Sequence, residues 1–229
     1  MTELFEYKTC ADAVKAARDY LLEQLKASDG NIVLLLSGGS SLNPVKEAFK
    51  LLDDETVGRI QLLQVDERYV DLSSSDSNWR QIKRALGSKF KRLASSAGML
   101  TRGEDAEDIA ITYEMEIREL LAGADETIGV YGVGADGHIA GMLPTKQPEE
   151  FTRFLDGRLV VDYQAHDFVR ITTTGALVTK LNELIVFACG PQKTAAVERI
   201  DQRLQPHEHP AQMLKDAARV KLFIGEEGD

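Results

Sequence analysis

The sequence predicts an α/β domain of three layers, in which helices cover both faces of a mostly parallel β-sheet. Segments with the pattern of strands alternate with segments with the pattern of helices, which is the order found in β–α–β units. Residues 31–37, "NIVLLLS", are apolar almost without a break, as in a strand covered on both faces. No repeat, low-complexity tract or long Gly/Ser linker divides the chain, so residues 1–229 are expected to form one domain.

The first half of the chain predicts three strands and four helices. The segment from about Ala11 to Lys26 is amphipathic, as expected of a helix that lies on the surface of a sheet. The elements are, in order, a strand at 3–7, the helix Ala11–Lys26, a strand at 31–37, a helix after Pro44, a strand at 59–65 that ends at Asp66, and helices near Trp79–Leu86 and Asp105–Ala122.

The second half continues the alternation. The strand "TIGVYGV" at 127–133 is followed by the loop "GADGH" and a short helix. Further strands are predicted at 158–163, 168–174, 183–189 and 220–225, with helices at Ala176–Leu181, Gln192–Ile200 and Pro210–Lys215. This order favours a mostly parallel sheet.

The formal net charge of −10 argues against general binding of nucleic acid or of anionic membranes. An anionic substrate therefore needs cations placed close to it. A few Arg or Lys side chains suffice for this, because salt screens carboxylates that lie more than roughly 8 Å away.

The cysteines and the N-terminus suggest an intracellular chain. Only Cys10 and Cys189 are present, so neither a disulfide framework nor a cysteine zinc site is expected. The first 20 residues lack the apolar core of a signal peptide, and no run of about 18 apolar residues occurs. We expect a cytoplasmic protein.

Three unusual loops follow predicted strands. "SGGSS" follows the strand at 31–37, "DER" the strand at 59–65, and "GADGH" the strand at 127–133. In a parallel sheet, ligands bind beyond the carboxyl ends of the strands. The three loops are therefore expected to form one site.

The first loop has the composition of a phosphate-binding turn. Gly38 and Gly39 permit backbone angles and close approach that a Cβ would block. Ser40 and Ser41 can cap the following helix or donate hydroxyl groups to an anion, and a helix N-terminus favours phosphate. A tight turn whose serines only cap the helix remains the alternative. The loop is not a P-loop, because no Lys-Ser/Thr follows at the required spacing.

The second loop carries charge at a strand end. Asp66 can accept hydrogen bonds from sugar hydroxyls or take a proton, and Arg68 can hold an anion through two hydrogen bonds. A solvated, salt-bridged turn is the alternative, and it is the preferred interpretation for Glu67 and residues 71–76. Residues 76–78, "DSN", are typical of a helix cap.

The third loop matches a dinucleotide fingerprint, Gly132-x-Gly134-x-x-Gly137, after a strand. No convincing second strand with a ribose-binding acid follows about 20 residues later, so NAD binding is disfavoured. Asp136 and His138 are more informative, because the loop exposes the imidazole. A histidine that only caps a following helix is the alternative.

Two later cations and a pair of histidines carry weaker signals. Arg170 and Lys193, each taken singly, have the pattern of ordinary surface cations. Residues 207–209, "HEH", lie between two prolines without a third partner nearby, which favours a solvated loop over a metal site.

The motifs in their order resemble the family of 6-phosphogluconolactonases and glucosamine-6-phosphate isomerases/deaminases over nearly the whole chain. "LSGGSSLNP" resembles the family's Ser-Gly-Gly-Ser-Thr-Pro loop, and "VDERYV" with "DSNWR" resembles its Asp-Glu-Arg and Ser-Asn segments. "GVGADGHIAGMLP" resembles Gly-x-Gly-x-Asp-Gly-His-x-Ala-Ser-Leu-Phe-Pro. "RITTT", "GPQK" and "HPAQML" resemble the family's later segments.

The resemblance implies a Rossmann-like α/β/α fold of the glucosamine-6-phosphate deaminase/ribose-5-phosphate isomerase type. It also implies that the first loop surrounds the 6-phosphate of a sugar, with cations from three further motif positions. The implied substrate-binding residues are Gly38, Gly39, Ser40, Ser41, Arg68, Arg170 and Lys193.

The choice between the two family activities depends on a few positions. Deaminases of the family carry a glutamate just before the proline of the "DGH" motif, where this chain has Leu143, which cannot transfer a proton. "SGGSS" and the arginine of "DER" also resemble the lactonases. Leu42 and Gly141 depart from the lactonase motifs, as does Leu143.

The resulting hypothesis is hydrolysis of 6-phospho-D-glucono-1,5-lactone in the oxidative pentose phosphate pathway. His138 acts as general base on water, Asp136 orients it or holds sugar hydroxyls, and Asp66 contacts the sugar or supports the loop. No metal or organic cofactor is expected, and the partner is a small sugar phosphate lactone rather than nucleic acid or membrane. A monomer or small homo-oligomer is expected. The alternatives are a glucosamine-6-phosphate deaminase and a non-catalytic sugar-phosphate-binding protein.

Overall fold

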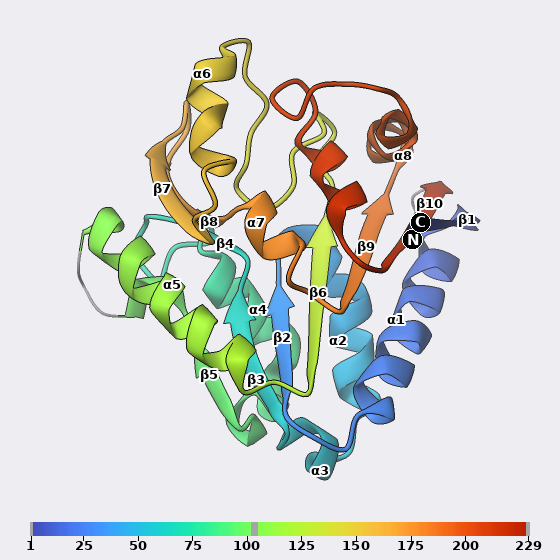
Figure 1. Ribbon diagram of the computed structural model, residues 1–229. Helices are drawn as coiled ribbons and strands as arrows, with labels where there is room; N and C mark the ends of the chain where they lie inside the picture. Colours follow the sequence, from blue (N-terminus) through green and yellow to red (C-terminus); the bar gives the residue numbers. More distant parts are fainter. Residues whose placement is uncertain (1, 102–104, 228–229) are drawn as a thin grey trace.

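A seven-stranded parallel sheet forms the centre of the computed structural model, which describes residues 2–101 and 105–227 (Figure 1). Within these residues the strand order is β1-β10-β9-β6-β2-β3-β5. The strands are β1 (Thr2–Thr9), β2 (Ile32–Leu36), β3 (Ile60–Gln64), β5 (Ser95–Ala97), β6 (Glu126–Gly132), β9 (Glu183–Cys189) and β10 (Val220–Glu227). The predicted α/β fold with a mostly parallel sheet is confirmed; the short strand β5 was not predicted.

Helices pack on both faces of this sheet, because its central strands are apolar on both sides. In β2, Val33 and Leu35 face one core, and Ile32, Leu34 and Leu36 face the other. The first core includes side chains of α5 (Ala106–Ala122). The second includes side chains of α1 (Cys10–Ala27), α2 (Leu42–Leu51) and α4 (Asn78–Leu86).

A second, antiparallel sheet stands beside the main one, in the order β4-β8-β7. Its strands are β4 (Asp66–Arg68), β7 (Val160–Gln164) and β8 (Val169–Thr173). The sequence predicted the two later strands but not this separate sheet. Asp66, predicted at the end of a strand, instead begins β4, which follows β3 after the single residue Val65.

Several helix predictions needed correction. The helix predicted after "GADGH" was wrong: Ile139 forms isolated bridges with Val133 and Met142, which close a compact loop. The helix α2 begins at Leu42 and contains Pro44 in its first turn, where a backbone N–H has no helical partner. The remaining short helices are α3 (Asp54–Val57), α6 (Pro148–Phe151), α7 (Gly175–Val178) and α8 (Pro191–Glu198), and Pro210–Asp216 is a 3₁₀ helix.

A tyrosine stabilises the end of β3, next to the second loop. The neighbouring strand β5 pairs no further than Leu63, so Gln64 has no strand partner on that side. The buried hydroxyl of Tyr113 in α5 fills the gap, accepting from Gln64 N at 2.6 Å and donating to Gln64 O at 3.0 Å. The chain therefore leaves β3 from a fixed position.

The two cysteines form a disulfide, with Cα atoms 5.5 Å apart. The sequence indicated no disulfide framework, and this single bond was not predicted. The two residues are 179 positions apart in the sequence, but β1 and β9 flank the same strand, β10, and this brings the start of α1 to the end of β9.

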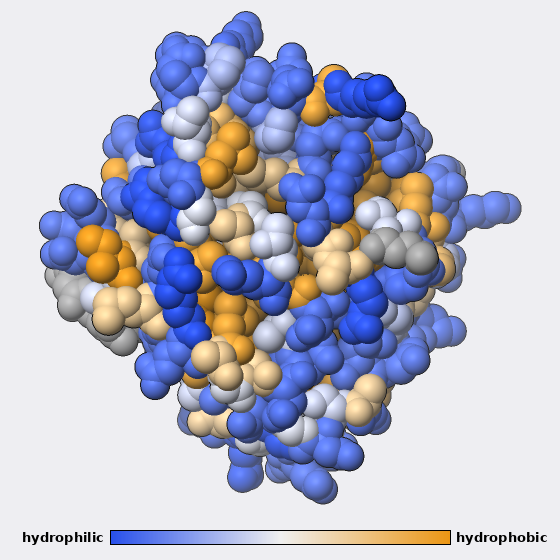
Figure 2. Space-filling view, viewed as in Figure 1, coloured by the Kyte–Doolittle hydropathy of each residue, from blue (hydrophilic) through white to orange (hydrophobic). Residues whose placement is uncertain are grey.

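The carboxyl ends of the parallel strands all point to the end of the molecule where α6, α8 and β7 lie (Figure 1). The face shown in Figure 2 is largely hydrophilic, with smaller hydrophobic areas between. In the part of the chain that the structure describes, every helix is too short or too polar to span a bilayer.

Candidate active site

A pocket of about 320 Å³ lies at the carboxyl ends of the parallel strands. Loops after β2 and β6, the strands β4 and β8, and the helices α4 and α8 contribute its walls. Every residue predicted for the site lines it except Asp136, which contacts the lining residue His138. The predicted lining residues are Gly38, Gly39, Ser40, Ser41, Asp66, Arg68, His138, Arg170 and Lys193.

The first loop is a single 3₁₀ turn, Gly39–Ser41, between β2 and α2. Gly39 has a φ of +75°, a conformation that favours glycine. A Cβ on Gly38 would collide with the side chain of Asn78. Ser41 Oγ donates to Gly38 O at 2.9 Å and makes no cap bond to α2, so this hydroxyl stabilises the turn. Ser40 Oγ accepts from Lys193 Nζ at 2.7 Å and so faces the pocket.

Asn78 connects the first loop to the second. Its Nδ2 donates to Asp66 Oδ2 at 2.9 Å, and its Oδ1 accepts from Arg68 Nη1 at 3.0 Å. Asp66 is buried and also accepts from Ser37 Oγ at 3.3 Å. The amide of Asn78 therefore bridges the carboxylate of Asp66 and the guanidinium of Arg68.

Glu67 is fully buried, so its assignment to a solvated turn was wrong. Its carboxylate accepts from the backbone N–H groups of Arg68, Asn78 and Trp79 and from two side chains, Ser77 Oγ and Gln64 Nε2, at 2.7–2.9 Å. Burial raises the pKa of Glu67, and these hydrogen bonds oppose the rise.

This carboxylate fixes the N-terminus of α4, and with it Asn78, against the second loop. Ser77 is the N-cap of α4, as the cap-like composition of residues 76–78 predicted, and accepts from Arg80 N. Asp71 and Asp76 are exposed, as expected.

Three cations from different elements meet at the pocket. Arg68 and Arg170 are opposite each other in the β4–β8 pairing. Arg170 is buried and forms an ion pair with Asp167 at 2.7 Å. The buried Nε of Arg68 has no hydrogen-bond partner among the described residues.

The third cation, Lys193, bonds to a neutral hydroxyl, Ser40 Oγ, rather than to a carboxylate. Burial lowers the pKa of Lys193. A bound anion would favour its charged form.

Asp136 and His138 form a close pair on the loop after β6. Asp136 Oδ1 lies 2.6 Å from His138 Nδ1 and also accepts from His138 N at 3.1 Å. Burial acts to raise the pKa of Asp136, but its bonds and charge interaction with His138 outweigh this and lower the pKa to about 2. The carboxylate is therefore ionised near neutral pH and can only accept. In the neutral imidazole of His138, Nδ1 therefore carries the proton, as the donor to this carboxylate, and Nε2 carries the lone pair.

The remaining sequence motifs have no such arrangement. The glycine fingerprint is followed by the bridged loop rather than by a helix, so it lacks the N-terminus on which a dinucleotide would rest. His209 is fully buried, so the solvated loop predicted for residues 207–209 was wrong for this residue. Among residues 2–101 and 105–227, no group of three or more His, Cys, Asp or Glu side chains is arranged to hold a metal ion.

The lining residues that were not predicted for the site include two polar side chains of α4, Asn78 and Gln81. Gln81 Oε1 accepts from Gly39 N at 3.0 Å. The two residues are three positions apart on α4, so they share a face of that helix. This spacing was the available signal, but only the packing of α4 shows which face meets the pocket.

Comparisons with known proteins agree with this fold and identify a family. The model of the family described as glucosamine-6-phosphate isomerases/6-phosphogluconolactonase matches residues 8–223. A 6-phosphogluconolactonase of Thermotoga maritima is 30% identical over 210 residues, covering 89% of each chain. One of Synechocystis is 28% identical over 210 residues, covering 88% of this chain and 85% of the relative.

A crystal structure of a 6-phosphogluconolactonase from Shewanella baltica superposes with a TM-score of 0.83, covering 98% of both chains. At 19% sequence identity, this likeness concerns the fold.

We expect Glu67→Gln to lower the free energy of unfolding by about 2 kcal/mol or more, since hydrogen bonds to a charged group contribute about 1.5–3 kcal/mol each. The new amide would also place its own donors against N–H and O–H groups. Urea denaturation followed by circular dichroism measures the change. Glu119→Gln, an exposed position on α5, is the control and should change stability by less than about 0.5 kcal/mol. Equal stability of both variants would show that the buried carboxylate does not fix the second loop.

Proposed function

This chain belongs to the glucosamine-6-phosphate isomerase/6-phosphogluconolactonase family, and from that premise we propose that it hydrolyses 6-phospho-D-glucono-1,5-lactone to 6-phospho-D-gluconate. This reaction is a step of the oxidative pentose phosphate pathway. The observation that carries the proposal is the Asp136–His138 pair, 2.6 Å apart, beside a pocket that holds three cations in a chain of net charge −10.

The phosphate binds between the first loop and the cations. Lys193 contributes a charge whose hydrogen-bond partner, Ser40 Oγ, is neutral. Arg68 adds a second cation whose hydrogen-bond partners are neutral, the Asp76 carbonyl and the Asn78 amide oxygen, whereas Arg170 shares its charge with Asp167. The sugar ring sets the distance from C6 to C1, so anchoring the phosphate places the lactone carbonyl in one position relative to His138.

His138 then acts as general base. Its Nε2 takes a proton from water as the water oxygen attacks C1, and the carbonyl becomes a tetrahedral oxyanion. The C1–ring oxygen bond breaks as the tetrahedral centre collapses, and Nε2–H returns its proton to the departing ring oxygen. The ionised Asp136 holds Nδ1–H and stabilises the imidazolium that forms between the two steps.

Asp66 completes the sugar-binding side of the pocket. It is buried at the pocket floor and held by Asn78 Nδ2 and Ser37 Oγ. Its carboxylate accepts hydrogen bonds from sugar hydroxyls in this proposal. The pocket would hold a single sugar phosphate, in keeping with its volume of about 320 Å³.

Deamination of glucosamine 6-phosphate is less compatible with the site. The family's deaminases place a glutamate at the position of Leu143, and in this chain Leu143 lines a neighbouring cavity rather than the pocket. No carboxylate from that position meets His138. Ammonia release from glucosamine 6-phosphate, without lactone hydrolysis, would favour the deaminase instead.

We expect His138→Ala to lower kcat for the lactone by about 10²–10⁴-fold, the usual contribution of a general base. A coupled assay with freshly generated 6-phosphogluconolactone measures turnover, corrected for spontaneous hydrolysis. Calorimetry should show 6-phosphogluconate binding within a few-fold of the parent. His166→Ala, an exposed position, is the control and should retain full turnover. Unchanged turnover in His138→Ala would refute its role as base.

We expect Lys193→Ala to raise KM for the lactone by about tenfold or more while changing kcat little, because it removes a charge that acts on the phosphate and not on C1. Steady-state kinetics at two salt concentrations measure this, and the variant should show a weaker dependence of KM on salt. Lys180→Ala, an exposed lysine, serves as the matched control. A lower kcat at constant KM would place Lys193 near the reacting carbon instead.

A further inference from the structure

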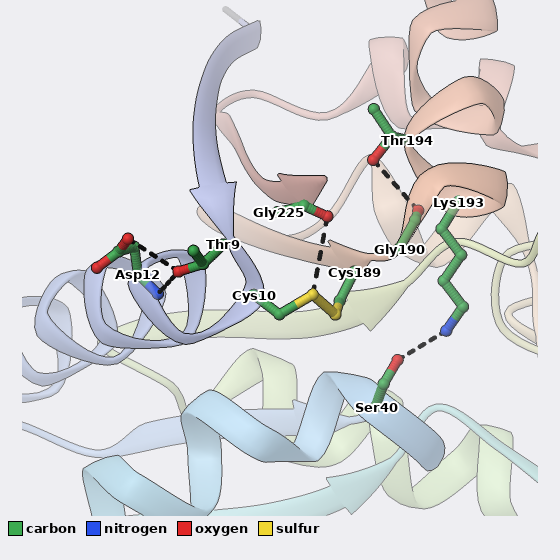
Figure 3. Close-up of a disulfide and its surroundings, with 9 residues drawn as sticks. All are labelled: Thr9, Cys10, Asp12, Ser40, Cys189, Gly190, Lys193, Thr194 and Gly225. Carbon is green, nitrogen blue, oxygen red and sulfur yellow. Dashed lines mark hydrogen bonds between the residues drawn. A yellow bond between two sulfur atoms is a disulfide. The ribbon is translucent and has the colours of Figure 1, made fainter. Parts of the chain in front are cut away.

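The disulfide lies close, along the chain, to one of the pocket's cations. Cys189 ends β9, Gly190 follows with a φ of +95°, and Lys193 lies in the first turn of α8 (Figure 3). The same lysine donates to Ser40 Oγ at 2.7 Å. Cys189 is therefore four positions before Lys193, the residue whose ammonium group contacts the first loop.

The bridge ties this part of the chain to two other elements. Cys10 is the first residue of α1, so the bond joins α1 to the point where β9 becomes α8. Gly190 N donates to Gly225 O at 2.9 Å, which attaches the same point to β10. A Cβ on Gly225 would lie 2.7 Å from Cys10 Cα and from Thr9 O, so only glycine allows α1 to begin this close to β10.

The two sulfur atoms differ in their surroundings. Cys10 is buried, with 6% of its surface exposed, whereas Cys189 is partly exposed. Because Cys189 is the more exposed of the two residues, we expect a reductant to attack its Sγ rather than that of Cys10. Cys10 lies in the first turn of an 18-residue helix, where the helix dipole stabilises a thiolate, and this makes Cys10 Sγ the better leaving group.

The reduced form also has a hydrogen-bond partner in place. Cys10 Sγ lies 3.8 Å from Gly225 O (Figure 3), an acceptor for the thiol proton once the bond is open. Gly225 O already accepts from Gly190 N, so the reduced pair would retain one non-covalent connection near the start of α8.

We propose that Cys10 and Cys189 form a reversible thiol–disulfide site that sets the affinity of the pocket for phosphorylated ligands through Lys193. In the oxidised form the bond restrains the start of α8 and keeps Lys193 against the first loop. In the reduced form the glycine at position 190 lets α8 shift, and Lys193 meets the phosphate less often. This inference rests on the proposed function for the identity of the ligand.

The reduction is a balanced two-electron exchange with a dithiol. A thiolate of the dithiol attacks Cys189 Sγ, forms a mixed disulfide and releases Cys10 Sγ as a thiolate. The second thiol of the reductant then attacks the reductant's first sulfur, which is bonded to Cys189 Sγ in the mixed disulfide. This releases Cys189 as a thiolate. The dithiol becomes a cyclic disulfide, and its two protons end on the two cysteines.

The test compares oxidised and dithiothreitol-reduced full-length protein. Alkylation and mass spectrometry should find no free thiol in the first and two in the second, and near-UV circular dichroism should confirm that both are folded. We expect calorimetry to show 6-phosphogluconate binding weakened by about fivefold or more on reduction, the lower end of typical coupling between sites. Reoxidation should restore the affinity.

Two variants separate the mechanism from a general loss of structure. The double variant Cys10→Ser/Cys189→Ser should bind 6-phosphogluconate as weakly as the reduced protein does, and dithiothreitol should not change its affinity. Lys193→Ala should bind weakly and equally in both redox forms, because the bond acts through that residue.

Each other outcome is decisive. Equal affinity of the two parent forms, or failure of the cysteines to pair under oxidising conditions, would overturn the thiol–disulfide proposal and leave the lactonase proposal intact. If neither redox form bound 6-phosphogluconate or hydrolysed the lactone, both the thiol–disulfide proposal and the lactonase proposal would be overturned.

Discussion

The contact between Asp136 Oδ1 and His138 Nδ1 determines what the pocket can do. At 2.6 Å, and with the pKa of Asp136 held at about 2, the carboxylate accepts a hydrogen bond from Nδ1–H, so the neutral imidazole has its lone pair on Nε2. The closed loop after β6 makes this geometry possible, since Ile139 pairs with both Val133 and Met142. A regular helix at this point would not return the chain to Val133.

The remainder of the fold places an anion at a fixed distance from this base. Parallel strands deliver the first and third loops to one edge of the sheet, and β4 turns away into a second sheet to bring Arg68 opposite Arg170. Buried Glu67 holds α4 against that strand. The negative net charge of the chain matters little here, because three cations line the pocket and salt screens carboxylates that lie more than roughly 8 Å away.

The sequence predicted the main sheet well because its signal is local. Strands such as β2 and β9 are continuous apolar segments with polar or glycine residues at their ends. Because the carboxyl ends of parallel strands lie at one edge of a sheet, the sequence also predicted that the three loops would meet, and they line one pocket. What it could not supply were pairings between distant segments: the second sheet, the Cys10–Cys189 bond and the burial of His209 all depend on which elements pack together. The prediction for Glu67 was wrong for the same reason, since three of its five donors come from the N-cap and first residues of α4.

Histidine-selective ¹⁵N NMR of the protein bound to 6-phosphogluconate tests the central claim most directly, with His138 assigned by comparison with His138→Ala. Near neutral pH we expect a neutral imidazole with Nδ1 protonated and Nε2 showing the shift of an unprotonated nitrogen. In Asp136→Asn this preference should be lost. A protonated Nε2 in the parent protein, unaffected by Asp136→Asn, would contradict the assignment of His138 as the base that activates water.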